Sequence, residues 1–202
     1  MTKEDESAEM GLAALLASLG GVTSTEEEDL RRVSYDAMKV SFAPDAVVTP
    51  TEDAQVGQVL RLANEFAIPV TTRGVGSTLT GSAAPIHGGW VLDLAGMNGF
   101  SIDEEERTCV AQPGAVVADL QKATEEVGLF YPPDPGSMKI STIGGNVAEN
   151  SGGVHCLKYG LTTNNILGIE MVLPDGEILR LGGKHMDSEC YDLLGVMTGS
   201  EG

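Results

Sequence analysis

Residues 69–83 read PVTTRGVGSTLTGSA, and this stretch decides the fold of the first half of the chain. It opens on a predicted strand at residues 68–71, which runs directly into a glycine-rich loop at residues 73–81. Upstream, residues 46–48 form a short apolar run, and apolar residues at helical spacing follow it. Residues 90–94 predict a third strand. We therefore expect a small β-α-β-loop-β unit with parallel strand pairing.

The second half of the chain predicts a different unit, in which strands pair as hairpins. Residues 99–103 and 108–112 alternate as short strands around a charged turn. An apolar-faced helix then ends at Gly128, the residue type that commonly forms a left-handed C-terminal cap. Residues 166–173 and 177–181 flank a Pro-Asp-Gly turn and predict a further hairpin. The expected fold class is α+β, with a small parallel unit beside a mixed or antiparallel sheet with helices.

Composition and charge exclude several classes of partner. The chain has 202 residues, of which 42% are hydrophobic, as in an ordinary globular protein. Thirty acidic residues against twelve basic ones give a formal charge of −18, so we expect no nucleic-acid partner. The three cysteines, Cys109, Cys156 and Cys190, lie far apart and form no C-x-x-C pair. We expect no metal site and a cytoplasmic location.

The first 44 residues predict a helical extension before a domain that covers residues 45–202. Residues 11–21 have the length of a signal-peptide core, but acidic residues precede them where a signal needs basic ones. The stretch is also too short to cross a bilayer. We interpret it as a docking helix and expect no membrane insertion.

Glycine and small hydroxyl residues are concentrated in two loops, at residues 73–81 and 141–153. Glycine lacks the Cβ that blocks close approach and adopts positive φ, so several backbone N–H groups can converge on one anion. Because the chain as a whole is so acidic, a bound pyrophosphate needs these local dipoles and hydroxyls. A lone glycine cluster is more often a mobile turn, but two such loops favour binding.

The sequence does not match either of two common nucleotide-binding motifs. The dinucleotide fingerprint G-x-G-x-x-G needs a glycine where Leu79 stands, and a helix where residues 82–85 read SAAP. A P-loop needs G-K-[ST], which the chain lacks. Neither a Rossmann domain nor an ATP or GTP site is favoured.

Five motifs in one order carry a family resemblance. They are PVTTRGVGSTLTGSA from Pro69, YPPDPGS from Tyr131, TIGGNVAENSGG from Thr142, KYG from Lys158, and GSEG at residues 199–202. From about Val33 to Gly202 the chain resembles the flavoproteins that include vanillyl-alcohol oxidase and p-cresol methylhydroxylase (PCMH). Within that family it is most similar to the glycolate oxidase D subunit and to D-lactate and D-2-hydroxyglutarate dehydrogenases.

The resemblance implies a PCMH-type fold in which FAD lies extended between two α/β subdomains. The residues that it places around the pyrophosphate are Gly74, Gly76, Ser77, Thr78 and Gly81. The residues that it places along the ribityl chain and flavin ring are Asp134, Ser137, Ser141, Gly144, Gly145, Asn150, Ser151 and Gly152. Ile169 would set its backbone against the adenine.

Other polar residues invite a functional interpretation. Cys156 and His155 stand where some relatives attach flavin covalently, but a small buried thiol and a hydrogen-bonded imidazole explain them better. His87 fits a solvated turn, and Asp134 is either an acid catalyst or a turn-forming carboxylate. Lys158 lies either near the flavin pyrimidine or on the surface, and both remain open.

The resemblance implies oxidation of a D-2-hydroxy acid, with hydride transfer to flavin N5. In relatives the catalytic base and the substrate's carboxylate ligand lie in a further C-terminal domain, so we expect the chain to stop before it and assign no catalytic residue. A small 2-hydroxy-acid substrate would bind through that domain, and likeness to glycolate oxidase implies an iron–sulfur partner subunit. The alternative is a flavin-binding module or truncated remnant without turnover of its own.

Overall fold

The computed structural model describes residues 3–183 and 191–202, so Cys190 lies outside the described residues. The chain divides into two compact units. The first comprises Met1–Gly96 with Met171–Leu179, and the second comprises Met97–Glu170 with Arg180–Gly202.

The first unit is built on a four-stranded sheet with strand order β1-β2-β4-β3. Its elements are α1 (Lys3–Leu19), β1 (Thr23–Ser24), α2 (Glu27–Val33), β2 (Ala46–Val48), α3 (Asp53–Phe66), β3 (Val70–Arg73), β4 (Trp90–Asp93) and the 3-10 turn η1 (Leu94–Gly96). Strand β4 pairs in parallel with both β2 and β3, whereas β1 pairs with β2 in antiparallel. The predicted parallel β-α-β-loop-β unit is therefore confirmed, and β1 is an addition that the sequence did not indicate.

The core of the first unit lies along β2 and β4, where every residue is buried. Val47 lies opposite Val91 in the parallel register. Val33 at the end of α2 packs with both, and all three side chains are almost inaccessible to solvent. Short runs of β-branched residues suit a strand that is covered on both faces. This packing explains why β2 and β4 lack the alternation of apolar and polar residues seen in half-exposed strands.

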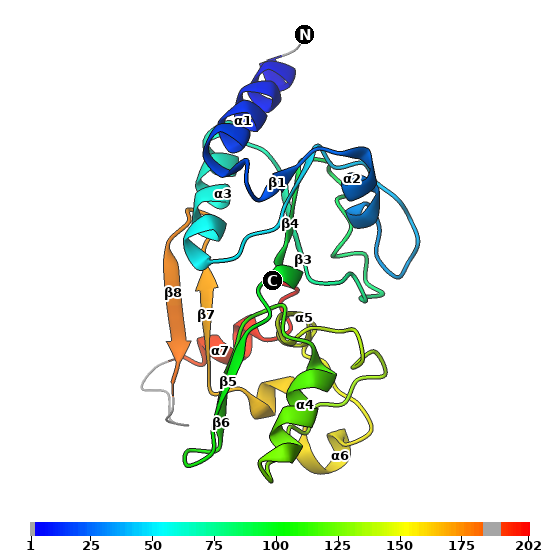
Figure 1. Ribbon diagram of the computed structural model, residues 1–202, viewed down its shortest axis with the longest axis vertical. Coiled ribbons are helices and arrows are strands. Elements are labelled where there is room, and N and C mark those ends of the chain that lie inside the picture. The colour runs from blue at the N-terminus through cyan, green and yellow to red at the C-terminus, as the bar shows by residue number, and fades with distance from the viewer. Residues whose placement is uncertain (1–2, 184–190) are drawn as a thin grey trace. The chain divides into compact units, whose positions relative to one another are not determined.

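Helix α1 packs against α3, as expected for a docking helix (Figure 1). Leu15 and Leu19 are buried, and the Ser7 hydroxyl donates a hydrogen bond to the Phe66 carbonyl at 2.8 Å. Gly11 stands at the contact, because a Cβ at that position would lie 2.5 Å from the Ile68 side chain. The apolar stretch at residues 11–21 thus has a packing role. None of the helices in the described ranges is long and apolar enough to cross a membrane.

The second unit contains short elements joined by long connections. They are β5 (Phe100–Asp103), β6 (Thr108–Ala111), α4 (Val117–Glu126), α5 (Ile143–Glu149), α6 (Cys156–Tyr159), the 3-10 turn η2 (Thr162–Asn165) and α7 (Leu193–Met197). Strands β5 and β6 pair in antiparallel, with Phe100 opposite Ala111. Gly128 has φ +75° just beyond α4, which confirms the predicted left-handed cap.

Strands β7 (Gly168–Val172) and β8 (Ile178–Gly182) form the second predicted hairpin and run in opposite directions (Figure 1). The sequence interpretation placed this hairpin wholly in the second unit, but its tip, Met171–Leu179, belongs to the first. There α3 holds the turn, since the Arg61 guanidinium donates to the Gly176 carbonyl at 3.0 Å and the Asn64 amide donates to the Pro174 carbonyl at 2.7 Å. These contacts join residues far apart in sequence, so no local pattern predicted them.

Replacing Leu15 by alanine tests the docking of α1. Leu15 is fully buried, and we expect Leu15→Ala to lower the free energy of unfolding by about 2–5 kcal/mol. The neighbouring Leu16 is 41% exposed, and Leu16→Ala should change stability by less than about 0.5 kcal/mol. Chemical denaturation followed by circular dichroism measures both. If Leu15→Ala lowers the free energy of unfolding as little as Leu16→Ala does, α1 does not contribute to the core.

Candidate functional site

The predicted site residues fall into two groups, one in each unit. Gly74, Gly76, Ser77, Thr78 and Gly81 all lie in the connection between β3 and β4 of the first unit. The second unit contains the other nine, which are Asp134, Ser137, Ser141, Gly144, Gly145, Asn150, Ser151, Gly152 and Ile169. Each group comes from a short span of chain, apart from Ile169 in β7.

The first loop contains two glycines in the left-handed region of backbone conformation. Gly76 and Gly81 adopt φ +69° and +89°, values that side-chain-bearing residues rarely reach. A chain of hydroxyl contacts orders the loop, because Thr80 Oγ1 lies 2.9 Å from both Thr78 Oγ1 and Ser82 Oγ. Thr80 and Ser82 were not among the predicted site residues, although their alternation with Thr78 was visible in the sequence.

Gly76 is needed for a further reason that the sequence did not reveal. A Cβ at Gly76 would lie 2.1 Å from Nη2 of Arg73, the last residue of β3. The guanidinium therefore occupies the space beside the glycine. At Gly81, by contrast, a Cβ would meet no atom within 4 Å, so only its positive φ favours glycine.

The second glycine-rich stretch, predicted as a loop, is largely helical. Residues Ile143–Glu149 form α5, and the Thr142 side chain caps it by accepting a hydrogen bond from the Gly145 N–H at 3.3 Å. Asn150 caps the C-terminal end of this helix and adopts φ +49°. The Asn150 side chain accepts a hydrogen bond from the Thr163 N–H at 3.0 Å. Small residues at 144 and 145 misled the prediction, since glycine disfavours helices.

Close packing accounts for two glycines in this unit. A Cβ at Gly144 would lie 2.7 Å from the Pro113 side chain, so α5 approaches the connection before α4 closely. A Cβ at Gly153 would lie 1.7 Å from the Asp134 carbonyl oxygen. This second contact draws together the segments on which Asp134 and Ser151 lie.

Buried polar atoms surround the start of α5. Asn146 is only 1% exposed, and neither of its amide atoms has a hydrogen-bond partner of regular geometry within the described residues. The Ser141 hydroxyl is also buried without a partner there. Tyr131 interacts with Asn146, and burial raises the pKa of its hydroxyl to about 12. Unsatisfied buried polar groups are costly and indicate a bound water or ligand.

An open hollow of about 540 Å³ lies beside Asp134. Its lining residues are Asp134, Pro135, Gly136, Met138, Lys139, Gly153 and Val154. The Asp134 carboxylate lies 3.6 Å from Nδ1 of His155, so it faces a side chain as well as the turn.

The other candidate residues either make structural contacts or are exposed to solvent. Nδ1 of His155 lies 3.3 Å from the Pro132 carbonyl, and Cys156 Sγ accepts a hydrogen bond from the Gly153 N–H at 2.8 Å. The imidazole is hydrogen-bonded as predicted, whereas the thiol is half-buried and not fully buried. Lys158 is exposed, with Nζ 4.7 Å from the centre of the Tyr159 ring. His87 lies exposed in a turn, as predicted.

Each unit has polar features of the kind that anion and cofactor sites use. The loop of the first unit has positive-φ glycines and hydroxyls, and the second unit buries atoms of Asn146 and Ser141 without regular partners among the described residues. Residues 44–182 match the FAD binding domain family, which is more than half of the chain. The chain belongs to the FAD-binding domain family.

Proteins of similar sequence support the assignment to the FAD-binding domain family. The FAD-binding domain is 44% identical to the glycolate oxidase subunit GlcD of Bacillus subtilis (strain 168), over 93% of the chain and 41% of that protein. It is 42% identical to a D-lactate dehydrogenase of Anaerostipes hadrus, over 84% of the chain and 36% of that protein. It therefore spans about two fifths of the length of these relatives.

The fold likewise resembles that of solved structures. An alkyldihydroxyacetonephosphate synthase superposes with a TM-score of 0.82 at 24% identity, covering 96% of the chain and 41% of the synthase. The predicted α+β class and PCMH-type fold are confirmed.

A side chain at Gly76 should abolish flavin binding. Gly76→Val in the FAD-binding domain forces a β-branched residue into positive φ and into the Arg73 guanidinium, so we expect little flavin to remain on the purified protein. Gly21 has open space around it, and Gly21→Val should retain wild-type flavin content. Absorbance of the purified proteins measures flavin per chain. The same flavin content in both variants would show that the first loop is only a turn.

Gly153→Ala should destabilise the second unit. Its Cβ would collide with the Asp134 carbonyl, and the shift needed to relieve the overlap should cost about 1–3 kcal/mol of unfolding free energy. Gly136→Ala is the matched control, since nothing lies within 4 Å of that position. Thermal unfolding compares the two, and an unchanged Gly153→Ala protein would argue against the close contact.

Proposed function

We propose that this chain holds FAD through the two groups of predicted residues. Gly74, Gly76, Ser77, Thr78 and Gly81 would bind the pyrophosphate with amides and hydroxyls. The nine residues of the second unit would bind the ribityl chain, the flavin ring and the adenine side. The observation that carries this proposal is the β3–β4 loop, with two positive-φ glycines ordered by a hydroxyl chain. In a chain of charge −18, such local groups are needed to attract an anion.

We further propose that the chain is the flavin-binding part of an oxidoreductase that acts on D-2-hydroxy acids of the glycolate or D-lactate type. The names of its relatives support this substrate class. When bound, FAD supplies the acceptor for a hydride. This chain's own residues would orient the cofactor, whereas substrate contacts would come from the part of the relatives that it does not match.

The proposal also includes the domain bounds, the cellular location and a partner subunit. Residues 1–44 would extend a domain formed by residues 45–202, and the protein would act in the cytoplasm. An iron–sulfur partner subunit would receive electrons, and the word subunit in the names of the glycolate oxidase relatives supports the presence of a partner chain.

FAD should bind without a covalent bond. Cys156 Sγ already accepts a backbone hydrogen bond, and His155 faces the Pro132 carbonyl and Asp134, so neither is presented as a free attachment point. Acid precipitation should therefore release all of the yellow colour into the supernatant. Flavin that stays with the pellet would contradict this prediction, and Cys156→Ser and His155→Asn would then identify the attachment.

Anaerobic mixing of the flavin-loaded chain with glycolate or D-lactate separates the proposed enzyme from a binding module. We expect no bleaching of the flavin band by this chain alone, because hydride transfer needs a substrate held close to the flavin beside a base. A longer protein that includes the unmatched part should bleach. A longer protein that binds FAD and does not bleach would favour the module without turnover.

A further inference from the structure

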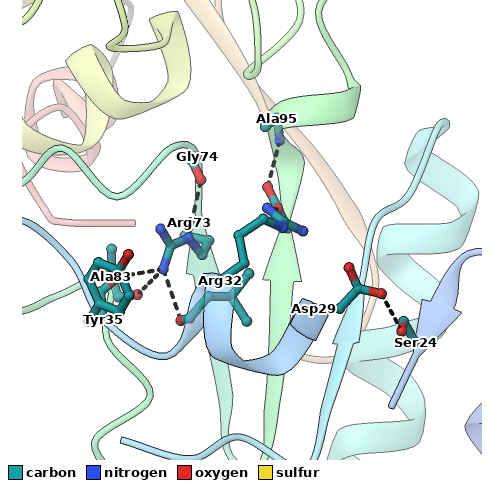
Figure 2. Close-up of polar contacts among 10 residues, drawn as sticks. Ser24, Asp29, Arg32, Tyr35, Arg73, Gly74, Ala83 and Ala95 are labelled. Carbon is teal, nitrogen blue, oxygen red and sulfur yellow. Dashed lines mark hydrogen bonds and ion pairs between the residues drawn. The ribbon is translucent and has the colours of Figure 1, made fainter. Parts of the chain in front are cut away.

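A buried arginine stands directly behind the glycine-rich loop. Arg73 is the last residue of β3 and is only 7% exposed. Figure 2 shows its guanidinium directed at the backbone of the segments around it. Arginine is seldom buried unless its N–H groups are satisfied, so the acceptors reveal what it organises.

The acceptors are backbone carbonyls from separate segments. Nη1 donates to the carbonyls of Val33 and Tyr35, each at 2.9 Å, and to that of Ala83 at 3.3 Å. Nε donates to the carbonyl of Gly74 at 3.3 Å. The Arg73 side chain thus connects both ends of the loop, at residues 74 and 83, to the end of α2 and the residues just after it. An additional backbone bond, from the Ala37 N–H to the Thr78 carbonyl at 3.2 Å, joins the middle of the loop to the same region.

The second terminal nitrogen of Arg73 lies against Gly76, where it fills the space of the missing Cβ. The guanidinium is therefore enclosed by loop backbone on one side and by residues 33–35 on the other. Three of the acceptors share the single nitrogen Nη1, so a lysine ammonium could meet part of this set. The bond from Nε to the Gly74 carbonyl and the packing of Nη2 against Gly76 use the other two nitrogens, which only an arginine has.

The positive charge of Arg73 is buried near two carboxylates. Burial lowers the pKa of its guanidinium, the Asp93 and Asp36 carboxylates partly offset that effect, and arginine stays protonated at neutral pH. Asp93 bonds to another arginine, because its Oδ2 accepts from Arg32 Nη1 at 2.7 Å. Asp36 uses its Oδ1 to accept from the Met38 N–H at 2.8 Å. The hydrogen bonds of Arg73 itself go to neutral carbonyls, while the buried Asp93 and Asp36 carboxylates lie close enough to act on its charge.

We propose that Arg73 is a positioning residue for the diphosphate of the cofactor, because its carbonyl bonds and its packing against Gly76 shape the loop of residues 74–83. This inference rests on the proposed FAD site. It differs from the site assignment in that Arg73 acts through the loop backbone and need not touch the ligand.

The test compares Arg73→Ala, Arg73→Lys and Arg61→Ala in the full chain. Arg61 is the matched control, since it also donates to a backbone carbonyl of the first unit but lies on α3. We expect Arg73→Ala to weaken FAD binding about 100-fold, from the loss of several charge-assisted hydrogen bonds. Arg73→Lys should recover only part of that loss, and Arg61→Ala should stay within about threefold of the wild type. Quenching of flavin fluorescence on titration measures each affinity.

Two further measurements separate positioning from general destabilisation. Methylguanidinium added to Arg73→Ala should restore FAD binding, because the small cation can occupy the vacated space, and it should not affect Arg61→Ala. Without flavin, amide hydrogen exchange in residues 74–83 should be faster in Arg73→Ala than in Arg61→Ala, with α3 unchanged.

Each outcome bears on the inference. If the wild-type chain binds FAD and Arg73→Ala binds it as tightly as Arg61→Ala, the inference about Arg73 is overturned and the proposed function stands. A wild-type chain without FAD affinity would overturn the proposed function, and hydrogen exchange would still decide whether Arg73 orders the loop. Should Arg73→Ala not fold, Arg73→Lys decides the question: a folded variant with wild-type affinity refutes the need for the guanidinium, and one with weakened affinity supports it.

Discussion

The parallel pairing of β3 with β4 is the constraint on which the first unit depends. These strands are consecutive in the chain and adjacent in the sheet, so residues 74–89 must carry the chain back to the start of β4. Parallel neighbours are usually joined by a helix that supplies its own hydrogen bonds. Here an irregular glycine-rich loop takes that place, beyond the carboxyl end of β3. Its backbone groups need other partners, and the Arg73 guanidinium donates to the Gly74 and Ala83 carbonyls. Within the loop the Thr78 and Thr80 hydroxyls accept from the N–H groups of Thr80 and Ser82.

A second physical demand follows from the net charge of −18. The long-range field of this chain repels an anionic cofactor, so attraction has to arise within a few ångströms of the phosphates. Backbone dipoles serve this purpose without adding mobile charge. The Arg73 guanidinium holds the loop that carries these dipoles through bonds to backbone carbonyls. Acidic surface and anion binding are thereby compatible in one molecule.

The second unit meets a different demand, which is to bring short elements close together with few strands. Gly144 lets α5 approach Pro113, and Gly153 lets the chain pass against the Asp134 carbonyl. The result encloses Asn146 and the Ser141 hydroxyl, whose polar atoms lack regular partners in the described residues. Glycine serves close packing here, whereas Gly81 serves backbone conformation alone and Gly76 serves both. The same residue type therefore has two physical roles in the two predicted loops.

The sequence by itself determined the strands β2, β3 and β4, the helices α3 and α4, both hairpins and the family, because apolar periodicity, turn residues and ordered motifs are local signals. It also marked the glycine-rich stretches, although it could not distinguish the helix α5 from a loop. Only the tertiary structure decided that Arg73 lies behind Gly76, that the hairpin tip at Gly176 docks on α3, and that β1 joins the sheet. Each of these contacts pairs residues that are distant in sequence or uses a side-chain direction, and neither leaves a periodic trace along the chain.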